Sequence, residues 1–84
     1  DLKKHKIMNT QDFLLKLQEE LEEEVTLQPE TNLKSLESYD SLALLTIIAF
    51  VDENFNKKVE AKHFKDIKTI DDLMMVIGKE NFEG

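Results

Sequence analysis

The segment from Ser41 to about Phe55 constrains the fold most, because as a helix it would be apolar around most of its circumference. Asp40 provides a favourable N-cap at its start. A helix of this kind has to be enclosed by other elements, so we predict that it lies at the centre of the molecule. Its main apolar stripe is Leu44, Ile47, Ile48, Val51 and Phe55, and Leu42, Leu45 and Ala49 lie beside that stripe.

Two further helices are predicted from capping boxes and apolar spacing. The first starts at Asn9 with Asp12 in the capping box, or at Thr10, and runs to about Glu24. The last starts at Thr69 with Asp72 in the box and runs to about Gly78. Their apolar faces are Phe13, Leu14, Leu17 and Leu21 in the first helix, and Ile70, Leu73, Met74 and Ile77 in the last.

Residues 25–40 lack helical periodicity and contain Pro29, which predicts a long loop. Apolar residues spaced along it would attach the loop to the core, so we expect the loop to be ordered. Residues 60–65 are predicted to form a short helix with Phe64 directed inward. The expected loop anchors are Val25, Leu27, Leu33, Leu36 and Tyr39.

These elements predict an all-α fold, a four-helix bundle with three longer helices, a short third helix and a long loop between the first two. The length of 84 residues suits one domain. We assign residues 9–79 to it and 80–84 to a flexible tail. Residues 1–8 would be an N-terminal extension or a non-native remnant.

The composition restricts the functional classes. The chain has 18 acidic residues and 11 lysines, no arginine and no cysteine. Nucleic-acid binding requires a cationic surface, so the net charge of −7 argues against it and favours docking on basic partners. The absence of cysteine excludes disulfides and a thiolate nucleophile. No apolar run approaches the roughly 20 residues of a membrane span. We therefore expect a cytoplasmic monomer without membrane insertion.

The triplet Asp40-Ser41-Leu42 is the main candidate for chemistry. It lies where the long loop enters the central helix. The first amides of a helix lack intrahelical partners and the dipole there is positive, so a phosphate ester on Ser41 would be stabilised. Taken alone, the triplet is better explained by ordinary capping, because short motifs are often misleading. Its place near mid-chain, in an acidic domain and before an apolar helix, favours the functional interpretation.

In this frame the sequence resembles the family of acyl carrier proteins and peptidyl carrier domains. The similarity includes residues 38–42 and the end of the following predicted helix, residues 53–55. It continues with Val59 and residues 67–73, and covers about residues 10–78. Asp-Ser-Leu is its most specific element.

The resemblance implies that Ser41 accepts 4′-phosphopantetheine from coenzyme A through a separate Mg²⁺-dependent phosphopantetheinyl transferase. Asp40 and Leu42 would be read by that transferase. The thiol of the arm would carry an acyl or aminoacyl group as a thioester and present it to transferring and modifying enzymes. The protein itself would not be an enzyme.

The sequence also departs from typical fatty-acid carriers, which have acidic residues along the second helix. Here two of those positions are apolar or neutral, and the short third helix is rich in lysine. This indicates a specialised rather than a housekeeping fatty-acid pathway, with partners that use a more apolar and less basic contact. The predicted partner-binding residues are Glu37, Ala43, Thr46, Phe50, Asp52 and Glu53.

One alternative from another class stays open: an acidic helical interaction module that is never modified and binds through Ala43, Thr46 and Phe50. A calcium loop starting at Asp52 is disfavoured, because its sixth position is Lys57 rather than glycine. We predict no catalytic residue and no metal site.

Overall fold

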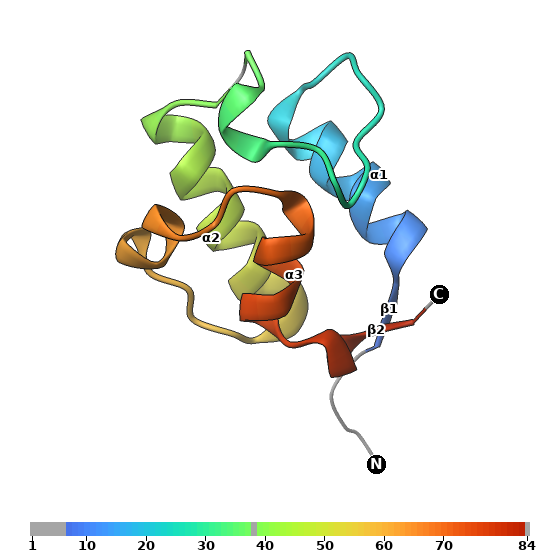
Figure 1. Ribbon diagram of the computed structural model, residues 1–84. Helices are drawn as coiled ribbons and strands as arrows, with labels where there is room; N and C mark the ends of the chain where they lie inside the picture. Colours follow the sequence, from blue (N-terminus) through green and yellow to red (C-terminus); the bar gives the residue numbers. More distant parts are fainter. Residues whose placement is uncertain (1–6, 38, 84) are drawn as a thin grey trace.

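Three α-helices dominate the computed structural model, which describes residues 7–37 and 39–83 (Figure 1). The mostly helical class is confirmed. The predicted four-helix bundle is not confirmed, because the predicted short third helix is a 3-10 helix and a small sheet is also present. The elements in chain order are β1 (Met8–Asn9), α1 (Thr10–Leu21), η1 (Leu33–Ser35), α2 (Ser41–Phe55), η2 (Ala61–Lys65), α3 (Ile70–Ile77), η3 (Lys79–Asn81) and β2 (Phe82–Glu83).

Helix α1 starts after the predicted cap Asn9, but the predicted capping box with Asp12 is absent, and the helix ends earlier than predicted. The Asn9 side chain caps it by accepting a hydrogen bond from the Gln11 amide at 2.8 Å. The helix ends at Leu21 rather than near Glu24, because Glu22 adopts a left-handed conformation with φ 54°. The amides of Glu22 and Glu23 then close the helix on the carbonyls of Glu19 and Gln18. Acidic side chains at a helix C-terminus oppose the dipole, which favours this early end.

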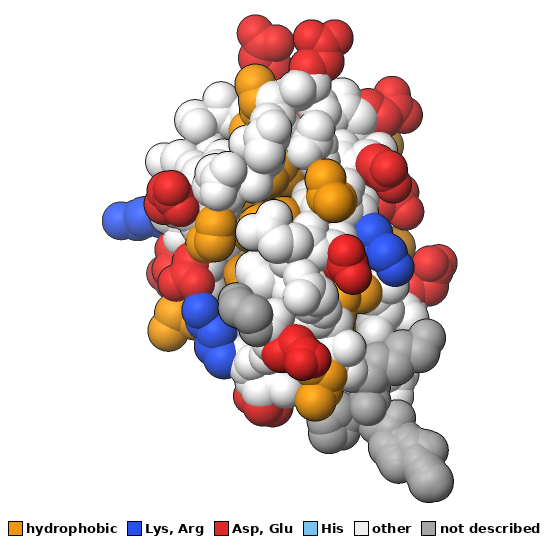
Figure 2. All heavy atoms as spheres, turned by 90° about the vertical axis from the view of Figure 1, so that its right-hand side faces the viewer, with side chains coloured by type: hydrophobic (Ala, Val, Ile, Leu, Met, Phe, Trp, Pro, Cys, Tyr) orange, Lys and Arg blue, Asp and Glu red, His pale blue; other side chains and the backbone are white. Residues whose placement is uncertain are grey.

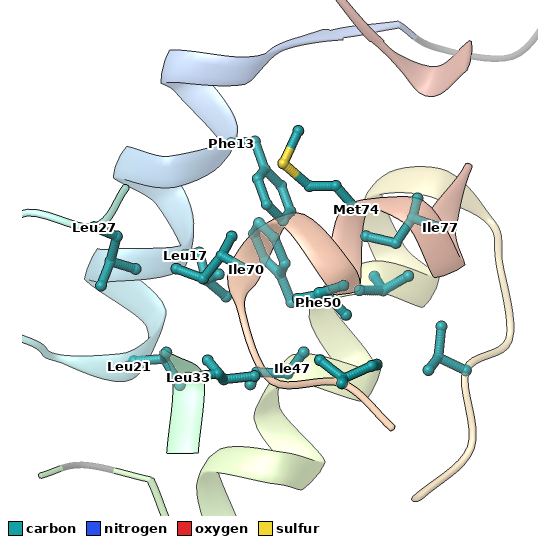
Figure 3. Packing of buried hydrophobic residues seen from close by; sticks show 14 of the residues in the cluster. Phe13, Leu17, Leu21, Leu27, Leu33, Ile47, Phe50, Ile70, Met74 and Ile77 are labelled. Atoms are coloured by element: carbon teal, nitrogen blue, oxygen red, sulfur yellow. The ribbon is translucent and has the colours of Figure 1, made fainter. Parts of the chain in front are cut away.

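The core is built from all three α-helices and the long loop, as Figure 3 shows. In α2, Ile47 and Val51 of the predicted stripe are fully buried, and the other members of the stripe are partly buried. The helix is not enclosed on all sides as predicted, because Leu42 and Leu45 beside the stripe are exposed. The predicted apolar faces of α1 and α3 are also confirmed. Figure 3 shows Phe13 and Leu17 from α1, Ile47 and Phe50 from α2, and Ile70 and Met74 from α3 directed into one cluster.

The loop between α1 and α2 is attached to the core by apolar side chains. Leu27 and Leu33 are buried, while Leu36 and Tyr39 are partly buried against the same cluster. Val25 was predicted as a fifth anchor, but 53% of it is exposed, because it lies directly after the end of α1 and before the chain turns inward. The prediction of an ordered loop therefore holds for four of its five anchors.

Backbone hydrogen bonds fasten this loop to the start of α3. The Leu33 amide donates to the Lys68 carbonyl at 2.8 Å. The Ile70 amide donates to the Thr31 carbonyl at 3.1 Å and the Asp71 amide to the Pro29 carbonyl at 2.8 Å. The amides of Ile70 and Asp71 belong to the first turn of α3, where a helix has no partners of its own. The loop therefore supplies part of the N-terminal cap of α3.

The predicted second capping box is confirmed at α3. The Thr69 hydroxyl accepts from the Asp72 amide, and an Asp72 carboxylate oxygen accepts from the Thr69 amide, both at 3.1 Å. Before it, the short helix predicted at residues 60–65 is present as the 3-10 helix η2, and Phe64 is buried as expected. Gly78 ends α3 with φ 113°, a conformation that favours glycine.

The C-terminal segment differs from the flexible tail predicted at 80–84. Strand β2 pairs in parallel with β1, with Met8 opposite Phe82 and Asn9 opposite Glu83. The ring of Phe82 lies 4.9 Å from that of Phe13 and 5.1 Å from that of Phe55, measured between centroids. The segment therefore covers one end of the core, and Met8, assigned to an extension, belongs to the same domain. Gly84 and residues 1–6 lie outside the described residues.

Replacing Phe82 by alanine tests this closure. We expect Phe82→Ala to lower the free energy of unfolding by about 1–3 kcal/mol, because it removes one edge-type and one tilted aromatic contact from a partly buried site. Urea unfolding measures the change. The neighbouring Glu83 is exposed, and Glu83→Ala is the control with an expected change within about 0.5 kcal/mol. Equal stability of both variants would mean that the segment does not contribute to the core.

The capping box also predicts a pH dependence. Hydrogen bonds from the backbone amides of Lys68 and Thr69 hold the pKa of Asp72 below its ordinary value. A lowered folded-state pKa stabilises the fold above the unfolded pKa, and this contribution is lost as the pH falls through the folded pKa. Asp72→Asn should therefore destabilise the fold most near neutral pH. The gap in stability between wild type and the variant should narrow as the pH falls.

Thermal melts of wild type and Asp72→Asn over a pH series measure that gap. Asp66→Asn is the matched control, because Asp66 is exposed and its carboxylate makes no hydrogen bond with the described residues. A gap for Asp72→Asn that stays constant from neutral to acidic pH would contradict the assignment.

Candidate functional site

Ser41 is the first residue of α2 and its side chain is exposed. Within the described part of the chain, its hydroxyl makes no hydrogen bond. Ser35, the other serine of this region that the structure describes, is exposed too, but its hydroxyl donates to the Asn32 carbonyl at 2.8 Å. Ser41 is therefore the one of these two serines whose oxygen is free to react.

Asp40 positions Ser41 by capping α2. Its backbone is extended, with φ −151°, and its Oδ1 accepts a hydrogen bond from the Ala43 amide at 2.9 Å. The Asp40 carbonyl accepts from the Leu44 amide at 3.0 Å. The predicted N-cap is thus confirmed, and Asp40 has a structural role whatever else it does.

The start of α2 offers unpaired amide groups beside Ser41. The amides of Ser41 and Leu42 make no hydrogen bonds with described residues, and the cap takes only the amide of Ala43. Unpaired amides and the positive end of the helix dipole both favour an anion. This arrangement fits the phosphate of a phosphopantetheine arm on the Ser41 oxygen.

The loop holds this corner from the other side. The Tyr39 amide donates to the Leu36 carbonyl at 3.1 Å, and both side chains are partly buried against the core. Desolvation raises the pKa of Tyr39 above its ordinary value, so this phenol stays neutral around pH 7. Ser38 was predicted to belong to the motif and lies outside the described residues.

The exposed face of α2 differs from the predicted partner surface. Ala43 and Phe50 were predicted to contact partners, but they are only 6% and 5% exposed. The physical reason is that both face α1, where the ring of Phe50 lies 5.8 Å from that of Phe13. Thr46 is half-buried at the edge of this interface. Ala43 and Phe50 therefore belong to the core, and their prediction as partner-binding residues was wrong.

Two exposed leucines take their place. Leu42 is 73% exposed and Leu45 is 60% exposed, and Ala49, one turn further, is exposed as well. We call these three residues the apolar strip. Ser41 and Leu45 are four residues apart, so the strip begins on the same side of α2 as the serine. The place of these residues beside the main apolar stripe, rather than on it, could have indicated that they are exposed. Their exposure was not predicted.

The predicted acidic partner residues do not form one group with Ser41. Glu53 lines an open groove of about 440 Å³ between α1 and α2, together with Glu19 and Glu20. Glu37 lines a separate hollow of about 360 Å³, together with Glu22 and Glu24. Asp52, the third predicted acid, accepts an ion pair from Lys58 at 3.3 Å. The three predicted acids therefore lie in three separate places rather than in one group.

The described residues provide neither a metal site nor a membrane-spanning helix. In residues 7–37 and 39–83, no group of three or more His, Cys, Asp or Glu side chains is arranged to hold a metal ion. Over the same residues, no helix has the length and apolarity needed to cross a membrane. Asp52 and Asn54, considered for a calcium loop, lie in the last turns of α2.

Comparisons of the chain with models of protein families, with curated proteins and with solved structures find no match. The site is therefore defined by its own geometry. It consists of an exposed serine at a capped helix start, two amides without a hydrogen bond to described residues, and an adjacent apolar strip.

The structural and chemical roles of Asp40 and Ser41 separate by mutation. Asp40→Ala removes the cap of α2 and should lower the free energy of unfolding by about 1 kcal/mol. Ser41→Ala should change it by less than about 0.5 kcal/mol, because the exposed hydroxyl has no partner among the described residues. Denaturant unfolding of the two variants measures both values. A Ser41→Ala loss as large as that of Asp40→Ala would show that the serine is a capping residue.

Proposed function

We propose that the protein is a carrier that holds acyl or aminoacyl groups as thioesters on a 4′-phosphopantetheine arm attached to Ser41. The observation that carries the proposal is the exposed, unpartnered Ser41 hydroxyl at the capped start of α2. Two further features support it. The Asp40-Ser41-Leu42 triplet resembles the modification motif of carrier proteins, and the short 3-10 helix η2 lies between α2 and α3, where that family has a short third helix.

In the attachment step, the Ser41 oxygen attacks the phosphorus atom of coenzyme A that bears the pantetheine. The new O–P bond replaces the bond to the other phosphate, so adenosine 3′,5′-bisphosphate leaves and the hydroxyl proton passes to a base of the Mg²⁺-dependent transferase. The amides of Ser41 and Leu42, which make no hydrogen bond with described residues, would then stabilise the negative charge of the phosphodiester.

Once attached, the arm supplies the thiol for thioester chemistry, a group that a chain without cysteine lacks. The residues of this chain bind and present, and none has a catalytic part. Leu42 extends into solvent beside Ser41 and is available to be read by the transferase. Asp40 acts through the cap, since its Oδ1 is engaged with the Ala43 amide. The proposal also includes that the carrier is a monomer and that it serves a specialised fatty-acid or related lipid pathway in the cytoplasm.

One observation favours a second candidate, an interaction module that is never modified. Two leucines more than half exposed, side by side on one helix, are typical of a protein contact site. Such a module needs no reactive serine. The two functions therefore differ in whether the protein gains the mass of a phosphopantetheine group at Ser41.

Incubation with coenzyme A, Mg²⁺ and a permissive phosphopantetheinyl transferase, followed by intact-mass measurement, decides between them. We expect wild type to gain the mass of one phosphopantetheine group and Ser41→Ala to gain none. Ser35→Ala is the matched control, because Ser35 is also an exposed serine near a helix start, and it should be modified like wild type.

The carrier proposal fails if wild type gains no mass with several transferases that each modify a known carrier in parallel. It also fails if Ser41→Ala is still modified. Unmodified wild type with a melting curve identical to that of Ser41→Ala would leave the interaction module as the function.

A further inference from the structure

Positive charge is concentrated in one segment of this acidic protein. Residues 57–68 contain five lysines and two acids, so the remainder of the chain has six lysines and sixteen acids. Figure 2 shows acidic side chains spread over the face formed by α1 and the following loop. The lysine-rich segment lies elsewhere, between α2 and α3 (Figure 1).

The fold brings these lysines beside the outer face of α2. Helix η2 packs against α2, and Lys58 reaches Asp52 of α2 at 3.3 Å. On the other side of η2, the Lys34 ammonium donates to the Lys65 carbonyl at 3.4 Å, which adds a lysine from η1. We call the five lysines gathered here the lysine surface: Lys34, Lys57, Lys58, Lys62 and Lys65.

Most of this charge is available to a partner. The ion pairs at Lys58 and Lys62 are exposed, with side-chain exposures of 86% and 71% for the two lysines, and exposed pairs of this kind are weak. Lys57 and Lys65 form no ion pair within the described residues. A partner carboxylate can therefore bind these lysines without breaking a strong internal contact.

The lysine surface borders the apolar strip. Leu45 and Asp52 are seven residues apart in α2, which is about two turns, so they lie on the same face. Because Lys58 is bound to Asp52, it lies along that face too. Exposed leucines and lysines are thus continuous from the first turn of α2 to η2.

We propose that this combined surface docks an acidic partner protein, which presents an apolar side chain flanked by carboxylates. The leucines provide the desolvated contact and the lysines pair with the surrounding acids, as a protein interface with an apolar centre and a charged rim requires. Charge complementarity of this kind raises the association rate and selects the partner. The inference goes beyond the carrier function and does not depend on modification of Ser41.

A protein is favoured over a lipid or nucleic-acid surface by the charge pattern. The net charge of −7 repels a uniformly anionic membrane or polymer. The lysines also alternate with acids, since Glu60 lies within 3.8 Å of Lys62 and Asp52 within 3.3 Å of Lys58. Such a mixed pattern matches a protein surface with defined positions of charge.

A helical peptide with leucines on one face and glutamates on both flanks serves as the probe, titrated into ¹⁵N-labelled protein. We expect it to shift the amide signals of Leu42, Leu45 and the lysines of η2. Lys65→Glu should raise the dissociation constant about threefold, and Lys62→Glu with Lys65→Glu about tenfold. Lys16→Glu on α1 makes the same charge change away from the surface and should have less than about twofold effect.

Three controls keep the outcome clear. The same peptide with glutamine for glutamate should bind more weakly, and Ser41→Ala should bind the glutamate peptide like wild type. Equal effects of Lys16→Glu and Lys65→Glu, or shifts confined to residues outside α2 and the lysine surface, overturn the proposal. Binding to phosphatidylglycerol vesicles without binding to the peptide overturns it in favour of a lipid surface. Because Ser41→Ala is included, failure here is distinct from failure of the mass test.

Discussion

The fastening of the long loop to the start of α3 is the constraint on which the site depends. Three backbone hydrogen bonds join residues 29–33 to residues 68–71. Two of them satisfy amides of α3 that a helix start leaves without partners, and all three hold the loop against the start of α3. A loop of this length would otherwise have large conformational freedom. The position of Ser41 therefore follows from the contact between two segments that are almost forty residues apart in the sequence.

The sequence predicted those features that depend on local physical chemistry. The Asp40 cap, the Thr69–Asp72 box and the glycine stop at Gly78 each involve residues a few positions apart, and all three are present. The buried faces of α1 and α3 were predicted from apolar spacing alone. In the candidate site, the exposed serine and its cap lie where the triplet placed them.

Features that depend on the relative placement of elements were not predicted. Helix α2 is apolar on most sides, so its sequence could not say which side faces α1, and Phe50 was assigned to the surface although Phe13 covers it. The pairing of β1 with β2 joins the two ends of the chain, and two-residue strands carry no readable periodicity. The early end of α1 depends on a left-handed glutamate, which the residue type does not favour.

The pairing of β1 with β2 also fixes where the protein can be attached to something else. Met8 lies opposite Phe82, and Phe82 packs on Phe55 at the far end of α2. A helix of 15 residues is roughly 20 Å long, so both ends of the folded domain emerge about that far from Ser41. A tether at either end, whether a neighbouring domain, a linker or an immobilising surface, would leave the serine corner facing away from its support.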